Sequence, residues 1–287
     1  MDIKTALAQA GALLQKNDIE QPRLDAEVLL CHLLNCQRAY LYAHADQQLT
    51  EAEVQNYRHL LDRRVAGQPV AYLVGSKEFM GLDFAVTPDV LIPRPDTELL
   101  VETAIQLINQ AKNPTPILVD VGTGSGAIAV STAHFLLQLK VVAVDISAAA
   151  LAVAQKNATR HQVARRIEFV QGNLLAPALQ KLLTSSVDII TANLPYVPSQ
   201  DIAGLSQEVR QEPILALDGG PDGLDLYRML KPQALQLLKP GGHLLIEIGP
   251  GQGDTALSIF SGPEWDSKLY HDLADRERLV VAQKILL

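Results

Sequence analysis

The chain has 287 residues, 48% hydrophobic and 20% charged, a composition typical of a soluble protein with one large domain, alone or with a smaller companion. Its net charge of −8 argues against a broad nucleic-acid-binding surface, although a local basic patch is still compatible with it. The seven histidines are scattered without paired metal-ligand spacing, so no metal is expected.

The cysteines and the hydropathy pattern favour the cytoplasm. Cys31 and Cys36 are the only cysteines and lie in a helical-looking stretch, which indicates reduced thiols in a reducing compartment. No apolar run is long enough to span a membrane, and the start lacks the charged-then-apolar order of a signal peptide.

Residues 1–75 predict a small helical domain. Apolar residues recur at helical spacing, and Thr50 with Glu53 forms a capping-box pattern that opens a helix ending near Gly67. Such a bundle carries no chemistry of its own and would serve packing or partner recognition.

Residues 76–90 predict a linker, with a short hairpin around Gly81. Prolines flanking Arg94 then restrict the backbone, and Asp96 or Thr97 is placed to cap the helix that follows.

From residue 114 the pattern alternates between strands rich in Val and Ile and helical segments. This alternation predicts an open, mainly parallel sheet with helices on both faces. After Trp265, residues 268–286 predict a closing antiparallel hairpin. We therefore expect an α/β fold with a Rossmann-like sheet of seven strands over residues 91–287. The five preceding strands are expected at residues 116–122, 140–146, 166–172, 187–193 and 242–249.

A glycine-rich turn between the first strand and its helix predicts a ligand site. Glycines let a ligand approach the backbone closely, and the helix start offers free N–H groups. Asp145 ends the next strand, 19 residues after Gly126, near the spacing at which an acid binds ribose hydroxyls. A plain tight turn is the alternative. The turn residues are Gly122, Thr123, Gly124, Ser125 and Gly126.

The spacing G-x-G-x-G differs from the dinucleotide pattern, and the chain has no Walker motif. A nucleoside without phosphates suits this turn better, and S-adenosylmethionine is such a ligand. Asn173 and Leu174, after the third strand, would meet the edge and the face of its adenine. An ordinary strand-ending turn explains this pair equally well.

The sequence Asn193-Leu194-Pro195-Tyr196 follows the fourth strand, at the edge where such sheets carry their reactive groups. The Asn193 side-chain oxygen and the Leu194 carbonyl could accept both hydrogens of a planar NH2 group, while Tyr196 stacks on it. Asn193 is also expected beside the cofactor. The alternative is a simple turn with a packed tyrosine.

These segments together resemble the PrmC/HemK family, the peptide chain release factor glutamine N5-methyltransferases. The resemblance runs over nearly the whole chain. It implies methyl transfer from S-adenosylmethionine, which becomes S-adenosylhomocysteine, to the glutamine of the Gly-Gly-Gln motif in class-I release factors. It also implies a helical domain that docks the release factor, and an Arg94 segment near the active site. The matching segments are residues 69–102, 119–130, 193–198, 212–228 and 244–253.

Two residues depart from the family pattern. Leu194 replaces the first proline of the signature, but leucine keeps the backbone carbonyl, and Pro195 restricts Leu194 to extended conformations. Asn173 stands where an acid is frequent, so a charge-assisted bond to adenine is lost and weaker cofactor binding is expected.

Two other functions stay open at this point. An N6-adenine methyltransferase acting on DNA or RNA shares the NH2 chemistry, but the acidic chain and the small helical domain disfavour it. A binding protein that lost activity through Leu194 is the other.

We expect a monomer that acts in translation termination without membrane or direct nucleic-acid partners. Glu247 is expected at a strand end, near the site or in a structural bond, and Tyr227 and Arg228 in packing and surface roles.

Overall fold

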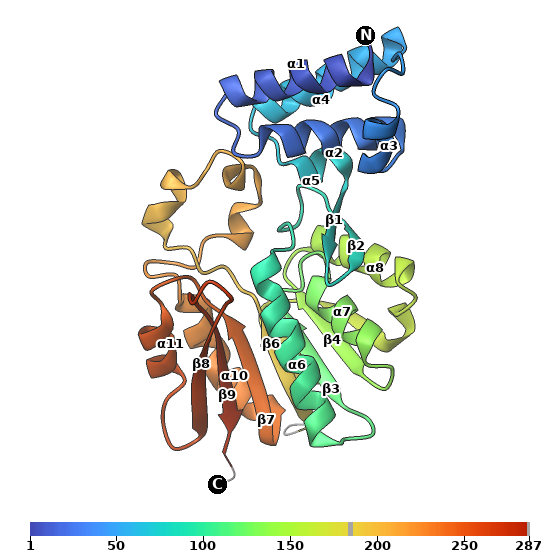
Figure 1. The fold of residues 1–287 in the computed structure, drawn as a ribbon. Coiled ribbons are helices and arrows are strands. Elements are labelled where there is room, and N and C mark those ends of the chain that lie inside the picture. The colour runs from blue at the N-terminus through green and yellow to red at the C-terminus, as the bar shows by residue number, and fades with distance from the viewer. Residues whose placement is uncertain (183–185, 286–287) are drawn as a thin grey trace. The chain divides into compact units, whose positions relative to one another are not determined.

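The computed structural model describes residues 1–182 and 186–285, which form two compact units (Figure 1). The first comprises Met1–Ser76 and Ser206–Gln211, and the second comprises Lys77–Leu205 and Glu212–Leu287. Within the described parts of the chain, no helix is long and apolar enough to cross a membrane.

The first unit is a helical bundle. Its apolar faces meet in one core around Ile3, Leu29 and Tyr57. The predicted capping box is confirmed, since the Thr50 hydroxyl accepts from the Glu53 N–H and the Glu53 side chain accepts from the Thr50 N–H. The helices are α1 (Ile3–Lys16), α2 (Pro22–Leu34), α3 (Arg38–Ala43), α4 (Glu51–Val65) and α5 (Val70–Val74).

A buried arginine ties the segment Ser206–Gln211 to this bundle. Arg64, at the end of α4, is 5% exposed and pairs with Asp25 of α2 at 2.7 Å and with Glu208 at 2.8 Å. Because burying an unpaired guanidinium is costly, both carboxylates stabilise this arrangement.

The predicted hairpin is present as β1 (Ser76–Phe79) and β2 (Leu82–Ala85). Met80 and Gly81 form its turn, both with positive φ. Phe79 and Phe84 are buried and pack edge to face, which anchors the hairpin to the core beneath α6 and α7.

The second unit contains the predicted sheet of seven strands, in the order β5-β4-β3-β6-β7-β9-β8. The first five of these are parallel, and β9 pairs antiparallel with both β7 and β8, so the predicted closing hairpin is confirmed. Residue 286, the last of that predicted segment, lies outside the described residues. The strands are β3 (Ile117–Val121), β4 (Lys140–Asp145), β5 (Ile167–Gln171), β6 (Val187–Ala192), β7 (Leu238–Glu247), β8 (Trp265–His271) and β9 (Glu277–Lys284).

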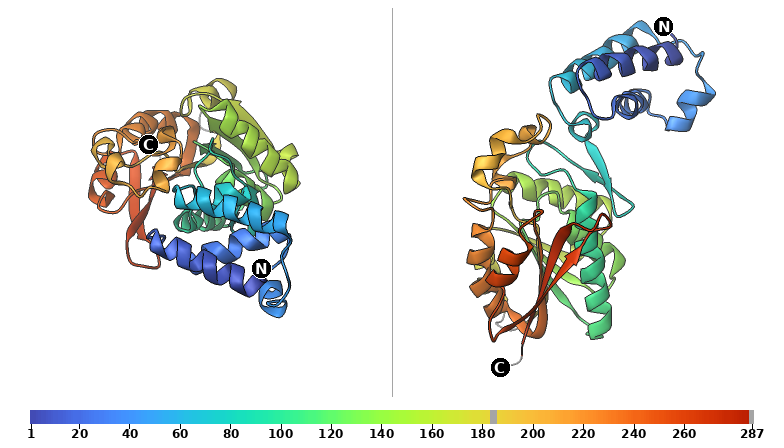
Figure 2. Two further views of the ribbon diagram at one scale, coloured as in Figure 1. Left: turned by 90° about the horizontal axis from the view of Figure 1, so that it is seen from above. Right: turned by 60° about the vertical axis from the view of Figure 1, so that its left-hand side comes forward.

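Helices cover both faces of the sheet, as the near-continuous apolar strands require (Figure 2). Alternate strand residues point to opposite faces, so Leu118 joins the core under α6, α7 and α8, and Val119 joins the core under α9, α10 and α11. These helices are α6 (Glu98–Ala111), α7 (Ala127–Phe135), α8 (Ala148–Arg160), α9 (Ala176–Lys181), α10 (Asp225–Leu237) and α11 (Gly253–Ile259).

Short 3-10 helices complete the unit at η1 (Pro95–Thr97), η2 (Ala164–Arg166), η3 (Ser199–Gly204) and η5 (Ile214–Ala216), and η4 (Val209–Gln211) belongs to the first unit. The predicted side-chain cap of α6 is wrong. Thr97 occupies the N-cap position, but neither it nor Asp96 makes a side-chain cap bond, because η1 leads directly into the helix.

Candidate active site

A cavity of about 370 Å³ opens at the carboxyl ends of β3, β4, β5 and β6. Nearly all the predicted site residues line it, and so does Arg94. Gly126 and Tyr196 are not among the lining residues. Those predicted from the sequence that do line it are Gly122, Thr123, Gly124, Ser125, Asp145, Asn173, Leu174, Asn193, Leu194 and Pro195.

The glycine turn needs glycine at two positions for steric reasons. Gly122 has φ +70°, and a Cβ there would lie 2.9 Å from Cδ2 of Leu194. Gly126 has φ +81°, and its Cβ would lie 3.0 Å from that of Ala154 on α8. Gly126 therefore lets α7 pack closely on α8, while Gly122 lets the Leu194 side chain reach the turn.

Two buried polar residues support this turn. Asp120 accepts hydrogen bonds from the hydroxyls of Thr123 at 2.6 Å and Thr191 at 2.8 Å, and burial raises its pKa to about 6. Asn157 of α8 accepts from the Ala85 N–H at 2.8 Å and donates to the carbonyl of Ser125 at 2.8 Å. Asn157 was not among the predicted site residues, although an asparagine on the apolar face of a predicted helix is a usable signal.

Asp145 joins the turn to the start of α8. Its Oδ2 accepts from the Gly124 N–H at 2.8 Å, and its Oδ1 accepts from the Ser147 N–H at 2.9 Å. Burial raises the pKa of this carboxyl, and the backbone N–H bonds oppose that rise. Each carboxylate oxygen keeps further acceptor capacity for hydroxyl groups of a ligand.

The loop after β5 holds an apolar side chain against the cavity. Leu174 is buried with φ +49°, a conformation that is strained for a branched side chain and is typical of functional loops. The next N–H, of Leu175, donates to Oε1 of Gln233 on α10 at 2.9 Å. Asn173 is exposed at the cavity edge.

The Asn193 side chain is held through its nitrogen. Its Nδ2 donates to the hydroxyl of Thr97 at 3.0 Å, and Thr97 also lines the cavity. This bond engages the nitrogen end of the carboxamide, so the oxygen end is available to a donor from a ligand.

The backbone of the loop is held by Tyr227, which is fully buried on α10. The Leu194 N–H donates to the Tyr227 hydroxyl at 3.2 Å. The Tyr227 hydroxyl in turn donates to the Glu247 carbonyl and lies 3.3 Å from the Leu194 carbonyl oxygen. The expected surface role applies to Arg228 alone, which pairs with Asp222 and Asp225. Helical spacing from Tyr227 to Leu230, Ala234 and Leu237 signals burial, but the hydrogen bonds join distant segments and leave no local pattern.

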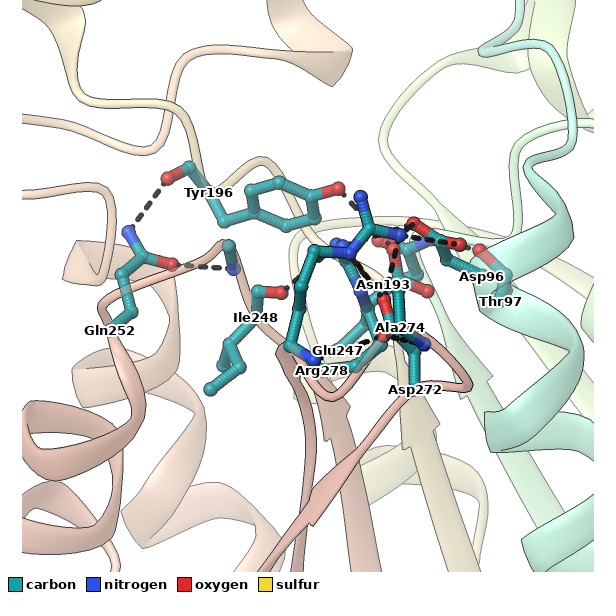
Figure 3. A network of polar contacts seen from close by, with 12 residues as sticks. Asp96, Thr97, Asn193, Tyr196, Glu247, Ile248, Gln252, Asp272, Ala274 and Arg278 are labelled. Atoms are coloured by element: carbon teal, nitrogen blue, oxygen red, sulfur yellow. Dashed lines mark hydrogen bonds and ion pairs between the residues drawn. The ribbon is translucent and has the colours of Figure 1, made fainter.

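Tyr196 lies outside the cavity lining, and its hydroxyl contacts Oε1 of Glu247 at 3.3 Å (Figure 3). Glu247 is 1% exposed, and burial raises its pKa to about 7 against the lowering effects of Thr97, Arg278 and Tyr196. Its carboxylate therefore belongs to a buried network beside the cavity.

Comparisons with known proteins agree with this architecture. Residues 5–75 match the model of the PrmC N-terminal domain, and residues 113–258 match that of a methyltransferase domain. A release factor glutamine methyltransferase of Moorella thermoacetica is 45% identical over 286 residues, 99% of each chain. One from Geobacter sulfurreducens is 43% identical over 260 residues, 90% of this chain and 88% of its own.

Among solved structures, the hMettl16 catalytic domain in complex with MAT2A 3'UTR hairpin 6 has a TM-score of 0.57. It is 16% identical and covers 79% of this chain and 82% of its own, a likeness that concerns the fold alone. The predicted Rossmann-like methyltransferase fold is thus confirmed. With relatives of 45% and 43% identity along nearly its whole length, the chain belongs to the release factor glutamine methyltransferases.

Proposed function

We propose that the protein transfers a methyl group from S-adenosylmethionine to the side-chain amide nitrogen of the glutamine in the Gly-Gly-Gln motif of class-I release factors. The observation that carries this proposal is that Asn193 and Asp145 line the same cavity. One side of the cavity offers acceptors for a carboxamide, and the other offers acceptors for a ribose.

The cavity residues fit this cofactor. Asp145 presents buried carboxylate oxygens of the kind that bind vicinal hydroxyls, the glycine turn admits close backbone approach, and Leu174 supplies an apolar surface for a purine. Bound S-adenosylmethionine supplies a methyl group on a cationic sulfur. Glycine-turn residues, Asp145, Asn173 and Leu174 would hold it.

Asn193 and Leu194 would orient the attacking amide. The amide lone pair is delocalised, so the nitrogen must be positioned, and the Asn193 Oδ1 and Leu194 carbonyl can accept its two hydrogens. Tyr227 donates its proton to the Glu247 carbonyl, which leaves lone pairs on the Leu194 carbonyl for the substrate. The departure at Leu194 keeps this acceptor and adds an N–H that proline lacks.

Tyr196 has a different part in this proposal from the stacking role expected for it. Its hydroxyl contacts Glu247, and its carbonyl accepts from Nε2 of Gln252 at 2.9 Å. We infer that in this conformation Tyr196 fixes the loop after Pro195. Stacking on a substrate amide would add to that role.

In this proposal residues 1–75 dock the release factor, residues 76–90 link the two domains, and residues 91–287 carry out catalysis. We further propose that the enzyme acts as a cytoplasmic monomer in translation termination, without direct nucleic-acid contact.

Mass spectrometry of a class-I release factor incubated with the enzyme and S-adenosylmethionine tests the function. We expect one added methyl group, on the glutamine of the Gly-Gly-Gln motif, and none on a release factor with alanine at that position. Methylation of DNA or RNA instead would favour the adenine-directed alternative. Cofactor binding without transfer to any release factor, reversed by Leu194→Pro, would support an inactivated protein.

Removing the Tyr227 hydroxyl is expected to loosen the loop. In Tyr227→Phe the buried Leu194 N–H loses its acceptor, so the free energy of unfolding should fall by about 1–3 kcal/mol and kcat about tenfold. Denaturant unfolding and steady-state kinetics would measure both. Tyr57→Phe is the matched control, because it loses a buried bond to the Ala26 carbonyl in the helical unit. An equal fall of kcat in both variants would contradict the role of Tyr227.

A further inference from the structure

We propose that Thr97 is a positioning residue for methyl transfer, which sets the orientation of the Asn193 carboxamide. This inference rests on the proposed function and adds to it a group outside the Asn193–Tyr196 loop. The two side chains come from different segments, namely η1 and the loop after β6 (Figure 3).

Thr97 is available for this role because its hydroxyl is not used by its own helix. It is a capping residue type at the N-cap of α6, yet it makes no side-chain cap bond. Instead its hydroxyl accepts from Nδ2 of Asn193 at 3.0 Å, and the side chain is 4% exposed at the cavity wall.

Glu247 lies in the buried network beside Thr97. Burial raises its pKa to about 7, and the Thr97 hydroxyl acts to lower it. Its Oε1 accepts from the Tyr196 hydroxyl at 3.3 Å, and among the described residues its Oε2 has no hydrogen-bond partner. Toward Asn193 the Thr97 hydroxyl presents a lone pair, because it accepts from Nδ2.

The Thr97 hydroxyl pairs with one end of the Asn193 amide. Because Nδ2 donates to Thr97, the Oδ1 oxygen is the end left for a donor from the substrate. Thr97 therefore keeps the Oδ1 oxygen directed to the substrate amide.

The segment carrying Thr97 is itself held by ion pairs. The neighbouring Asp96 pairs with Arg278 at 3.0 Å and with Arg276 at 3.4 Å, and Arg278 is 4% exposed (Figure 3). Both arginines lie in or next to β9, so the closing hairpin fixes the position of η1.

The test is steady-state methylation of a release factor by Thr97→Val, which keeps the shape of the side chain and removes its hydroxyl. We expect kcat to fall about tenfold, with the dissociation constant of S-adenosylmethionine changed less than twofold. Thr97→Ser should restore kcat to within about threefold of wild type. Thr132→Val is the matched control, since it removes a fully buried hydroxyl that bonds to the Ile128 and Ala129 carbonyls of its own helix, and it should leave kcat unchanged.

A double-mutant cycle separates positioning from general damage. In an Asn193→Ala background, Thr97→Val should have no further effect on kcat, because the amide that it orients is gone.

Wild-type kcat in Thr97→Val, no rescue by Thr97→Ser, or an undiminished effect in the Asn193→Ala background would each overturn the inference. The Thr97→Ser outcome holds even where Thr97→Val does not fold. These outcomes require that the wild-type enzyme methylates the release factor. Failure of that reaction would count against the proposed function itself.

Discussion

Asn193→Ala should lower kcat for release factor methylation about 100- to 1000-fold, a loss of about 2.7–4 kcal/mol, comparable to removing one positioned polar group that acts in the transition state. The substrate amide would lose the acceptor that directs its lone pair. The cofactor dissociation constant should change less than threefold, because the ribose site at Asp145 is intact. Single-turnover kinetics and calorimetry would measure the two quantities.

Asn113→Ala is the control for this change. Asn113 donates to Asp188 at 2.8 Å near the start of β3, at the opposite edge of the sheet from the cavity. Its loss should leave kcat near the wild-type value. If Asn193→Ala weakened cofactor binding as much as turnover, Asn193 would be a cofactor residue rather than part of the amide clamp.

Asp145→Ala should have the reverse effect and weaken cofactor binding about 10- to 100-fold. The variant loses charge-assisted bonds to the ribose, worth about 1.5–3 kcal/mol, and it leaves the N–H groups of Gly124 and Ser147 without their acceptor. At saturating cofactor, kcat should recover to within about tenfold of wild type. Calorimetric titration with S-adenosylhomocysteine would measure the affinity.

Asp188→Asn serves as the comparison for Asp145. Asp188 is also a buried acid on a parallel strand, but it bonds Asn113, Ile117 and Lys239 away from the cavity. Its replacement should lower stability without changing cofactor affinity. Unaltered affinity in Asp145→Ala, with reduced stability alone, would remove Asp145 from the proposed cofactor site.

Each half of the cavity has a buried acid beside it. Asp120 and Glu247 lie at the ends of β3 and β7, and burial raises the pKa of each, to about 6 and about 7. Asp120 bonds to threonines under the glycine turn, whereas Glu247 bonds to Tyr196 in the Asn193 loop. Each carboxyl thus supports one half.

The strands, the covering helices, the hairpin at Gly81 and the closing antiparallel pair were predictable from the sequence, because hydrophobic period and turn residues are local signals. The glycine turn, Asp145 and the Asn193 loop were also placed at one edge, since parallel strands bring their carboxyl ends together. These features follow from local sequence signals and sheet topology alone.

The partners of those residues were decided by the tertiary structure. Asp96 or Thr97 was expected to cap α6, yet Thr97 bonds Asn193, which is 96 residues away in the chain. Tyr227 was expected to pack, yet it also holds the Leu194 backbone, and Tyr196 turned toward Glu247. Periodicity reports which face of an element is buried, but a hydrogen bond between buried side chains depends on how distant elements pack, and that geometry exists only in the folded chain.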